Sequence, residues 1–173
     1  MPSSVAPPPY AGSEIRSRGG AWRWVSAWVP VAFCIGIIAM ESTPAFGADH
    51  TSGPLRHFFE FLFHRHFTPT EWWWWHMSIR KGGHFTGYGI QSVAWFRALW
   101  MTWRAEDPDR PRIAVHALAM MGTFFVASCD EFHQTFLPNR SGSFWDVMLD
   151  CSGALVLQLL VWLWMRTRSG ARA

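Results

Sequence analysis

The chain has few tyrosines and cysteines, and it lacks the short motifs of several common enzyme classes. It contains 2 Tyr and 3 Cys, against 13 Trp and 14 Phe, in 173 residues. The cysteines form no CxxC pair and are odd in number, which predicts small buried packing residues, with a reactive Cys129 as the alternative. HExxH, GxSxG and P-loop patterns are absent, so no catalytic motif identifies a reaction.

Two further absences narrow the class of protein. No basic stripe interleaves with aromatic residues in a polar segment, so we expect no nucleic-acid partner. The apolar segments lack the alternation of a barrel strand, which leaves helices as the elements that satisfy their backbone groups in a membrane. The sequence therefore predicts an all-α fold.

Half of the residues are hydrophobic, and they concentrate in four windows. Each window approaches the roughly 17 to 25 residues that a membrane-spanning helix needs. We predict a bundle of four transmembrane helices, which together form one domain over residues 23–166. The predicted spans are about 24–41, 84–103, 112–134 and 144–165.

Basic residues divide unevenly between the two sides of this bundle. One side would hold Arg16, Arg18, Arg23, Arg104, Arg110, Arg112, Arg166, Arg168 and Arg172, and the other Arg56, Arg65, Arg80, Lys81 and Arg140. The positive-inside rule then predicts cytoplasmic termini and an outward-facing loop after the third span. A cleavable signal ending near Ala48 is the alternative interpretation of the first span.

Three segments lie outside the predicted spans, and their compositions predict two tails and an interfacial helix. Residues 1–22 begin with a stretch rich in Pro, Ser and Gly and predict a disordered cytoplasmic tail, while residues 167–173 predict a short basic one. Between the first two spans, apolar residues from Leu55 to Phe67 recur at helical spacing, and Trp72 to Trp75 follow. This pattern predicts a short amphipathic helix at the membrane interface.

His57, His64 and His66 lie in the same segment as that amphipathic helix. Their spacing is a weak ligand pattern, and we expect solvated side chains there. No metal site and no cofactor are predicted from this sequence.

Polar side chains gather at the outward ends of three predicted spans. At each end they recur at helical spacing, so each helix presents a polar stripe. The predicted ligand-binding residues are Lys81, His84, Tyr88, Asp130, Glu131, His133, Gln134, Arg140, Asp146 and Asp150. Ionisable groups at membrane depth cost about 2.5 to 3.5 kcal/mol each, so we expect them to converge and pair in one pocket.

The four acidic residues of this set outnumber Lys81 and Arg140 by two. A protonated carboxylate, a protonated histidine or a bound cation would each balance the excess. A charge cluster that only fixes helix register is the alternative without a ligand.

At these residues the chain resembles the VanZ-like family of small bacterial membrane proteins. The similarity covers about residues 25–165 and includes "ESTP", "RKGGHFTGYG" and "DEFHQTFLPNRSGSFWDVMLDCSG". This chain has Asp150 where the family typically has Asn, and Leu157 where the family has a small residue. The resemblance implies a multi-pass protein of the bacterial inner membrane that acts in the cell envelope, and a link to teicoplanin-type glycopeptide resistance.

Two functions follow as expectations. The first is a non-enzymatic factor that binds membrane lipids at this pocket, in particular an anionic lipid or a lipid-linked cell-wall intermediate. The second is a hydrolase or transferase acting on a lipid phosphate or glycan carrier, with Glu131, His133 or Asp130 as candidate catalytic groups. The sequence does not decide between them.

Overall fold

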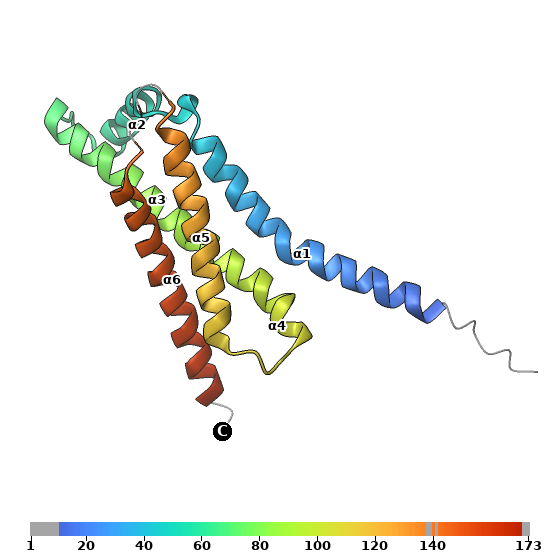
Figure 1. The fold of residues 1–173 in the computed structure, drawn as a ribbon. Helices are drawn as coiled ribbons and strands as arrows, with labels where there is room; N and C mark the ends of the chain where they lie inside the picture. Colours follow the sequence, from blue (N-terminus) through green and yellow to red (C-terminus); the bar gives the residue numbers. More distant parts are fainter. Residues whose placement is uncertain (1–10, 138–139, 141, 171–173) are drawn as a thin grey trace, which may run out of the picture.

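The regular structure is helical throughout the described part of the chain, which confirms the all-α prediction. The computed structural model describes residues 11–137, 140 and 142–170, with residues 11–19, 169 and 170 given by their backbone alone. Its elements are α1 (Ala11–Glu41), the 3-10 turn η1 (Pro44–Phe46), α2 (Ala48–Phe63), α3 (Pro69–Met101), α4 (Trp103–Glu106), α5 (Arg112–Gln134) and α6 (Phe144–Gly170) (Figure 1).

Among the described residues, three helices are long and apolar enough to cross a membrane. They are the segments Gly20–Glu41 of α1, Arg112–Gln134 of α5 and Phe144–Arg168 of α6. Each overlaps one of the spans predicted from the sequence. The fourth predicted span, residues 84–103, lies in α3, whose windows are less apolar because they include Gln91, Ser92 and Arg97.

Helix α3 begins well before the predicted span. Pro69 occupies its first turn, and Thr68 and Glu71 form a reciprocal capping box that satisfies the first backbone N–H groups. The helix then continues through Gly82 and Gly83, where an added Cβ would meet open space. The tryptophan run from Trp72 to Trp75 is therefore part of α3 and not of the preceding loop.

The central position of α3 explains its mixed composition. It supplies residues to each of the three buried apolar clusters, with Ala94 and Ala98 facing α1, Tyr88 facing α5 and α6, and Phe96 facing α5. Figure 1 shows it crossing the bundle behind α5 and α6. A helix enclosed by neighbours needs little apolar surface for lipid, so hydropathy alone underrates it.

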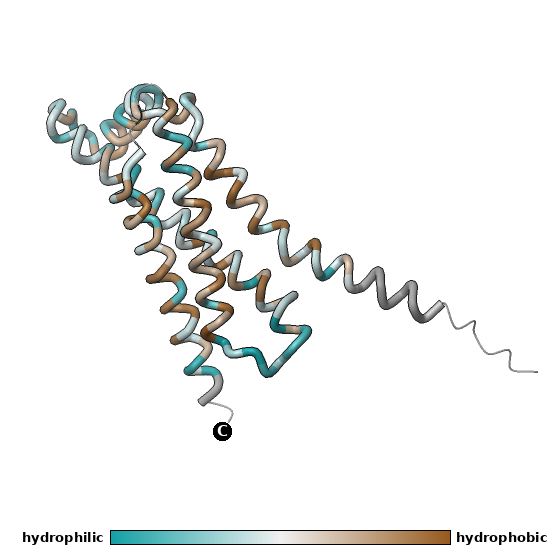
Figure 2. Tube along the Cα trace, in the orientation of Figure 1, coloured by the Kyte–Doolittle hydropathy of each residue, from teal (hydrophilic) through white to brown (hydrophobic). Residues whose placement is uncertain are grey.

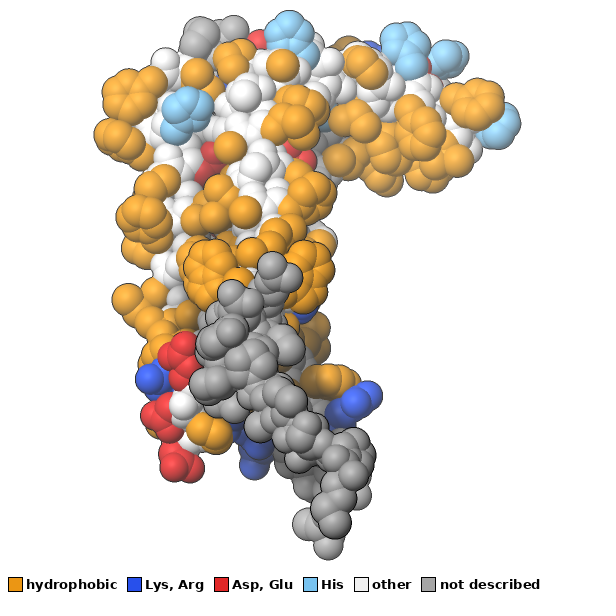
Figure 3. Space-filling model, turned by 90° about the vertical axis from the view of Figure 1, so that its right-hand side faces the viewer, with side chains coloured by type: hydrophobic (Ala, Val, Ile, Leu, Met, Phe, Trp, Pro, Cys, Tyr) orange, Lys and Arg blue, Asp and Glu red, His pale blue; other side chains and the backbone are white. Residues whose placement is uncertain are grey.

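The outside of the bundle is apolar. Large hydrophobic side chains on α5 and α6, among them Phe125, Leu160 and Leu163, expose half or more of their surface. Figure 2 shows hydrophilic residues at both ends of the bundle, and Figure 3 shows hydrophobic side chains over much of the face in view, with charged side chains most numerous at its lower end. An exposed apolar surface of this extent is typical of contact with lipid.

The chain departs from expectation at its ends and in the first loop. Helix α1 already begins at Ala11, after the prolines at positions 2, 7, 8 and 9, so only residues 1–10 of the expected tail lie outside the described residues. Helix α6 continues to Gly170, inside the expected tail at 167–173, of which residues 171–173 lie outside the described residues.

Helix α2 ends earlier than the apolar spacing suggests. His64 adopts a left-handed conformation, with φ 52°, and closes the helix. The chain then turns back, and Glu60 accepts a hydrogen bond from the Phe67 N–H at 2.9 Å while Arg56 donates to the Phe67 carbonyl. These contacts bury Phe67 against the turn outside the helix.

Candidate functional site

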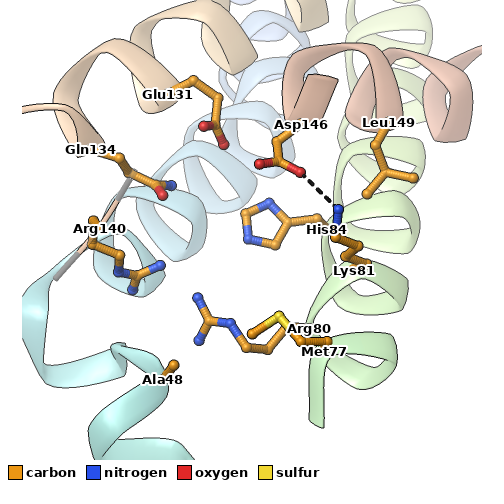
Figure 4. Close-up of a pocket in the computed structure, with 10 residues that line it drawn as sticks. All are labelled: Ala48, Met77, Arg80, Lys81, His84, Glu131, Gln134, Arg140, Asp146 and Leu149. Carbon is orange, nitrogen blue, oxygen red and sulfur yellow. Dashed lines mark hydrogen bonds and ion pairs between the residues drawn. The ribbon is translucent and has the colours of Figure 1, made fainter. Parts of the chain in front are cut away.

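A polar pocket of about 190 Å³ opens where four elements meet. It lies between the start of α2, the first half of α3, the end of α5 and the start of α6 (Figure 4). Its lining residues are Ala48, Met77, Arg80, Lys81, His84, Glu131, Gln134, Arg140, Asp146 and Leu149.

Three cationic side chains face this polar pocket. Lys81 Nζ lies 3.3 Å from Asp146 Oδ1 in an ion pair. Arg80 instead donates to the Phe46 carbonyl at 3.0 Å, and Arg140 donates to the Glu41 carbonyl at 3.0 Å. Carbonyl oxygens therefore orient both guanidinium groups, and neither forms an ion pair with a carboxylate among the described residues, although the charge of Glu41 acts on Arg80.

The arginines also act on each other. Burial, followed by the positive charge of Arg140, lowers the pKa of Arg80 from its ordinary value. Figure 4 shows both guanidinium groups pointing into the same cavity. Two like charges held this way favour an anion between them.

Carboxylates lie on the opposite wall. Glu131 is 5% exposed, and its Oε2 accepts the Ser143 N–H at 2.9 Å, which joins the end of α5 to the start of α6. Ser143 also accepts the Trp145 N–H at 3.2 Å and so caps α6. This connection fixes Glu131 and Asp146 on neighbouring helix ends.

Behind the pocket, a second layer of polar groups is buried. Tyr88 donates to Asp130 Oδ2 at 3.0 Å, and Gln134 donates to the same oxygen at 3.2 Å. Asp150 is fully buried, and its Oδ1 lies 3.5 Å from His84 Nδ1. That separation is an electrostatic contact rather than a hydrogen bond, since neither oxygen of Asp150 has a hydrogen-bond donor among the described residues.

Close contact between α3 and α6 brings His84 and Asp150 together. A Cβ added at Gly153 would lie 2.0 Å from the Phe85 carbonyl oxygen, so only glycine permits the two backbones to approach this closely. A Cβ at Gly142 would similarly lie 2.0 Å from the Glu131 carbonyl oxygen. Two glycines thus set the width of the site.

Nine of the ten predicted ligand-binding residues lie in or directly behind the polar pocket. Lys81, His84, Glu131, Gln134, Arg140 and Asp146 line it, and Tyr88, Asp130 and Asp150 form the buried layer. His133 does not line it. Its side chain is exposed, and Nδ1 lies 3.3 Å from the Ser42 hydroxyl, on the side of α5 that faces the end of α1.

Two other details differ from the sequence expectation. Lys81 and Arg140 were counted together against the acidic residues, but only Lys81 pairs with one of them, and Arg140 binds main-chain carbonyls because the chain at the end of α1 passes within reach of its guanidinium. Arg80 lines the pocket and was not among the predicted residues. Arg80 is next to Lys81 in the sequence, just before the predicted span, and this position could have identified it as a pocket residue.

A further polar group lies deeper in the bundle. His116 Nδ1 is 2.6 Å from Gln158 Oε1, and Gln158 donates to the Ser92 carbonyl at 2.8 Å. These contacts join α5, α6 and α3 by side chains that a lipid environment would otherwise leave unsatisfied.

An apolar exterior, three long apolar helices and buried polar groups between them define a multi-pass membrane protein with a polar site at one end of its bundle. The comparison with known families agrees with this class. The chain matches the VanZ/LLP1 family over residues 27–165 and belongs to it, which confirms the resemblance seen in the sequence. No curated protein and no solved structure is significantly similar to the chain.

Proposed function

We propose that this protein binds the anionic headgroup of a lipid, or of a lipid-linked cell-wall intermediate, in the polar pocket. The main observation in support is the pair of guanidinium groups of Arg80 and Arg140. Both face the cavity and are hydrogen-bonded to carbonyl oxygens rather than to carboxylates. Planar guanidinium groups match phosphate oxygens in geometry and charge.

The size of the pocket supports a headgroup as the bound part. Its volume of about 190 Å³ is below the roughly 300 to 1,000 Å³ typical of pockets that enclose a whole small molecule. A phosphate or diphosphate group fits such a space while the acyl or polyprenyl chain stays in the membrane. The exposed apolar faces of the bundle would contact that chain.

The proposal takes α3 as a fourth span beside α1, α5 and α6. The part of α3 from Tyr88 to Ala98 packs against all three other helices, which lie at membrane depth by their hydropathy. A helix that packs in the middle of such a bundle must cross the membrane with the other three helices. We place the protein in the bacterial inner membrane.

The proposed orientation has cytoplasmic termini and an outward-facing pocket. Arg104 and Arg110 follow the end of α3, and Arg166 and Arg168 lie in the last turns of α6, all away from the pocket, where Figure 1 shows α4 and the C-terminus. Basic residues favour the cytoplasmic side. Lipids of the outer leaflet are then the ones that reach the site.

Lipid binding by the full-length protein in detergent tests the proposal. Native mass spectrometry would compare undecaprenyl phosphate, phosphatidylglycerol and zwitterionic phosphatidylcholine. We expect the two anionic lipids to bind in preference to phosphatidylcholine. Arg80→Gln and Arg140→Gln should each weaken this binding about 10-fold or more, since a hydrogen bond to a charged group contributes about 1.5 to 3 kcal/mol.

Arg97→Gln is the matched control. Arg97 is an exposed α3 arginine whose guanidinium also binds a main-chain carbonyl, that of Ser26 at 2.9 Å, but it lies away from the pocket. Equal lipid affinity of the Arg97→Gln and the Arg80→Gln/Arg140→Gln proteins would refute the pocket as the binding site.

A second candidate function is a hydrolase or transferase acting on the lipid phosphate. The observation that favours it is that Glu131 and His84 share the pocket with three cations, so a proton acceptor and charge-stabilising groups are close together. His133 lies outside the pocket, which leaves Glu131 as the preferred acid–base group. Phosphate released from undecaprenyl diphosphate by the wild type, and not by Glu131→Gln, would support catalysis.

The same proposal suggests a route to teicoplanin-type resistance. Both this protein and a glycopeptide would then act on cell-wall intermediates at the membrane. A protein that holds a lipid-linked intermediate would compete with the glycopeptide there. Loss of a resistance phenotype in cells carrying Arg140→Gln at normal protein level would support this link.

A further inference from the structure

The charge balance behind the polar pocket is the most unusual feature of the bundle. Asp130, Glu131 and Asp150 are each at least 90% buried, with exposures of 8%, 5% and 0%. In the described part of the chain, the single ion pair that reaches any of them is the one between His84 and Asp150. Three buried carboxylates thus face one imidazole, and buried charges without partners are strongly disfavoured.

His84, Asp130 and Glu131 lie close enough together to share one ion. One ligand atom each from these side chains lies within 4.8 Å of the others. Ligand atoms around a tetrahedral ion at about 2.0 to 2.2 Å are about 3.3 to 3.6 Å apart. Side-chain rotations that close this remaining gap would bring all three atoms onto a single cation.

Asp130 and Glu131 each use one carboxylate oxygen to accept hydrogen bonds. The other oxygen of each side chain is available to bind such an ion. Tyr88 and Gln134 both donate to Oδ2 of Asp130, and the Ser143 N–H is donated to Oε2 of Glu131. Oδ1 of Asp130 and Oε1 of Glu131 receive no hydrogen bond among the described residues. Ligating carboxylates are commonly held through their second oxygen in this way.

Asp150 gives the independent indication of a cation. It is completely buried, neither oxygen has a donor in the described chain, and it lies 3.5 Å from Nδ1 of His84. A carboxylate beside one imidazole nitrogen selects the tautomer that leaves the other nitrogen free to bind metal. Asp150 is then a positioning residue for His84.

We propose that His84, Asp130 and Glu131 bind a divalent transition-metal ion such as Zn²⁺, which bridges α3 and α5 behind the polar pocket. One nitrogen and two oxygen ligands favour Zn²⁺ over Mg²⁺ or Ca²⁺, which take oxygen ligands. Because both His84 and Glu131 line the pocket, a fourth coordination position faces its interior. Glu131 would then hold the ion instead of acting as a base.

The metal alone tests this inference, without any lipid. Full-length protein in detergent is treated with chelator, titrated with Zn²⁺ by calorimetry, and measured for bound metal after gel filtration. We expect one tightly bound Zn²⁺ per chain. Glu131→Gln and His84→Gln should bind at least about 100-fold more weakly, because loss of a ligand exceeds the 10- to 100-fold cost of losing an outer-shell partner.

Two controls keep the result specific. Asp107→Asn removes a carboxylate that pairs with Arg110 at the other end of the bundle, and it should keep its Zn²⁺ affinity. The double variant His57→Gln/His66→Gln removes exposed histidines near α2 and should also keep it. Loss of binding in that double variant would assign the ion to the α2 region and overturn the proposal.

Co²⁺ provides a second measurement on the wild type, in case a ligand variant fails to fold. Its visible absorption should change from that of the hydrated ion to that of a four-coordinate site with nitrogen and oxygen ligands. An unchanged spectrum, or binding below one ion per chain in the wild type, overturns the proposal. Lipid binding is measured separately, once with chelator and once with Zn²⁺. The result for the metal can then be distinguished from the result for the anion-binding proposal.

Discussion

Few groups near Asp150 can stabilise a negative charge on its side chain. Both of its oxygens are buried without a hydrogen-bond donor among the described residues, and its nearest charged partner is the His84 ring at 3.5 Å. In chelator-treated protein, Asp150→Asn should therefore increase the free energy of unfolding by about 1 to 3 kcal/mol, because a neutral amide costs less to bury. Unfolding by SDS, followed by circular dichroism, would measure this change.

Asp146→Asn is the matched comparison for that experiment. Its carboxylate is one third exposed and pairs with Lys81, so the variant should change stability by less than about 1 kcal/mol. If Asp150→Asn instead destabilises the chelator-treated protein, the carboxylate at 150 has a donor that stabilises it.

The predictability of the site also differs from residue to residue. Helical spacing correctly placed Asp130 and Gln134 together, since residues four apart share a face. The same argument placed His133 with them, yet one step of about 100° around α5 turns it toward Ser42. Spacing along one helix cannot show which neighbour occupies each side, so the binding of Arg140 to the carbonyls at the end of α1 was not predicted.

At the level of single helices, the contact between α3 and α6 depends on Gly153. An added Cβ would overlap the Phe85 carbonyl at 2.0 Å. Gly153→Ala should separate the two helices and destabilise the protein by about 3 kcal/mol or more, at the upper end of the overpacking range. Thermal unfolding in detergent would show a lowered midpoint, together with weaker lipid and Zn²⁺ binding.

Gly87→Ala is the control on α3 itself. A Cβ at Gly87 meets nothing within 4 Å, and alanine is the better helix former by up to about 1 kcal/mol. This variant should match or exceed the wild type in stability. A large loss at Gly87, or none at Gly153, would mean that the close contact is not required.

The turn between α2 and α3 is predicted to respond to acid. Hydrogen bonds from the Phe67 N–H and then from Arg56 lower the pKa of Glu60 to about 2. A lowered pKa means that the stabilisation is complete above about pH 4.5 and is lost as the pH falls toward 2. The protection factor of the Phe67 amide in hydrogen exchange, which is corrected for the intrinsic rate, should fall across this range, and Glu60→Gln should remove that dependence. A pH-independent protection factor in the wild type would contradict this assignment.

The helices were predictable to different degrees from their residues. Continuous apolar runs identified α1, α5 and α6, because lipid-facing helices must be apolar. The start of α3 was missed, although Thr68, Pro69 and Glu71 form a capping signature. The predicted span began only at residue 84, whereas the helix is continuous through Gly82 and Gly83.

For the whole molecule, orientation in the membrane is the property that decides which lipids reach the site. Single cysteines at Asp49 and Glu106, in a background with Cys34, Cys129 and Cys151 replaced, would report it. Asp49 begins α2 on the pocket side, and Glu106 ends α4 at the other end of the bundle. An impermeant thiol reagent on intact cells should label position 49 and not position 106. Labelling at 106 before permeabilisation would reverse the orientation.

The length of α3 also determines where in the bilayer a ligand would be held. Its 33 residues extend about 50 Å at 1.5 Å per residue, whereas the hydrocarbon core is about 30 Å thick. In the proposed four-span arrangement, the rise of about 26 Å from Met101 to His84 would put Arg80 and Lys81 at the depth of the lipid phosphates. A lipid could therefore enter by diffusing sideways within its own leaflet, with its headgroup still hydrated and its tail never leaving the hydrocarbon. Capture at that depth requires no extraction of the lipid from the membrane.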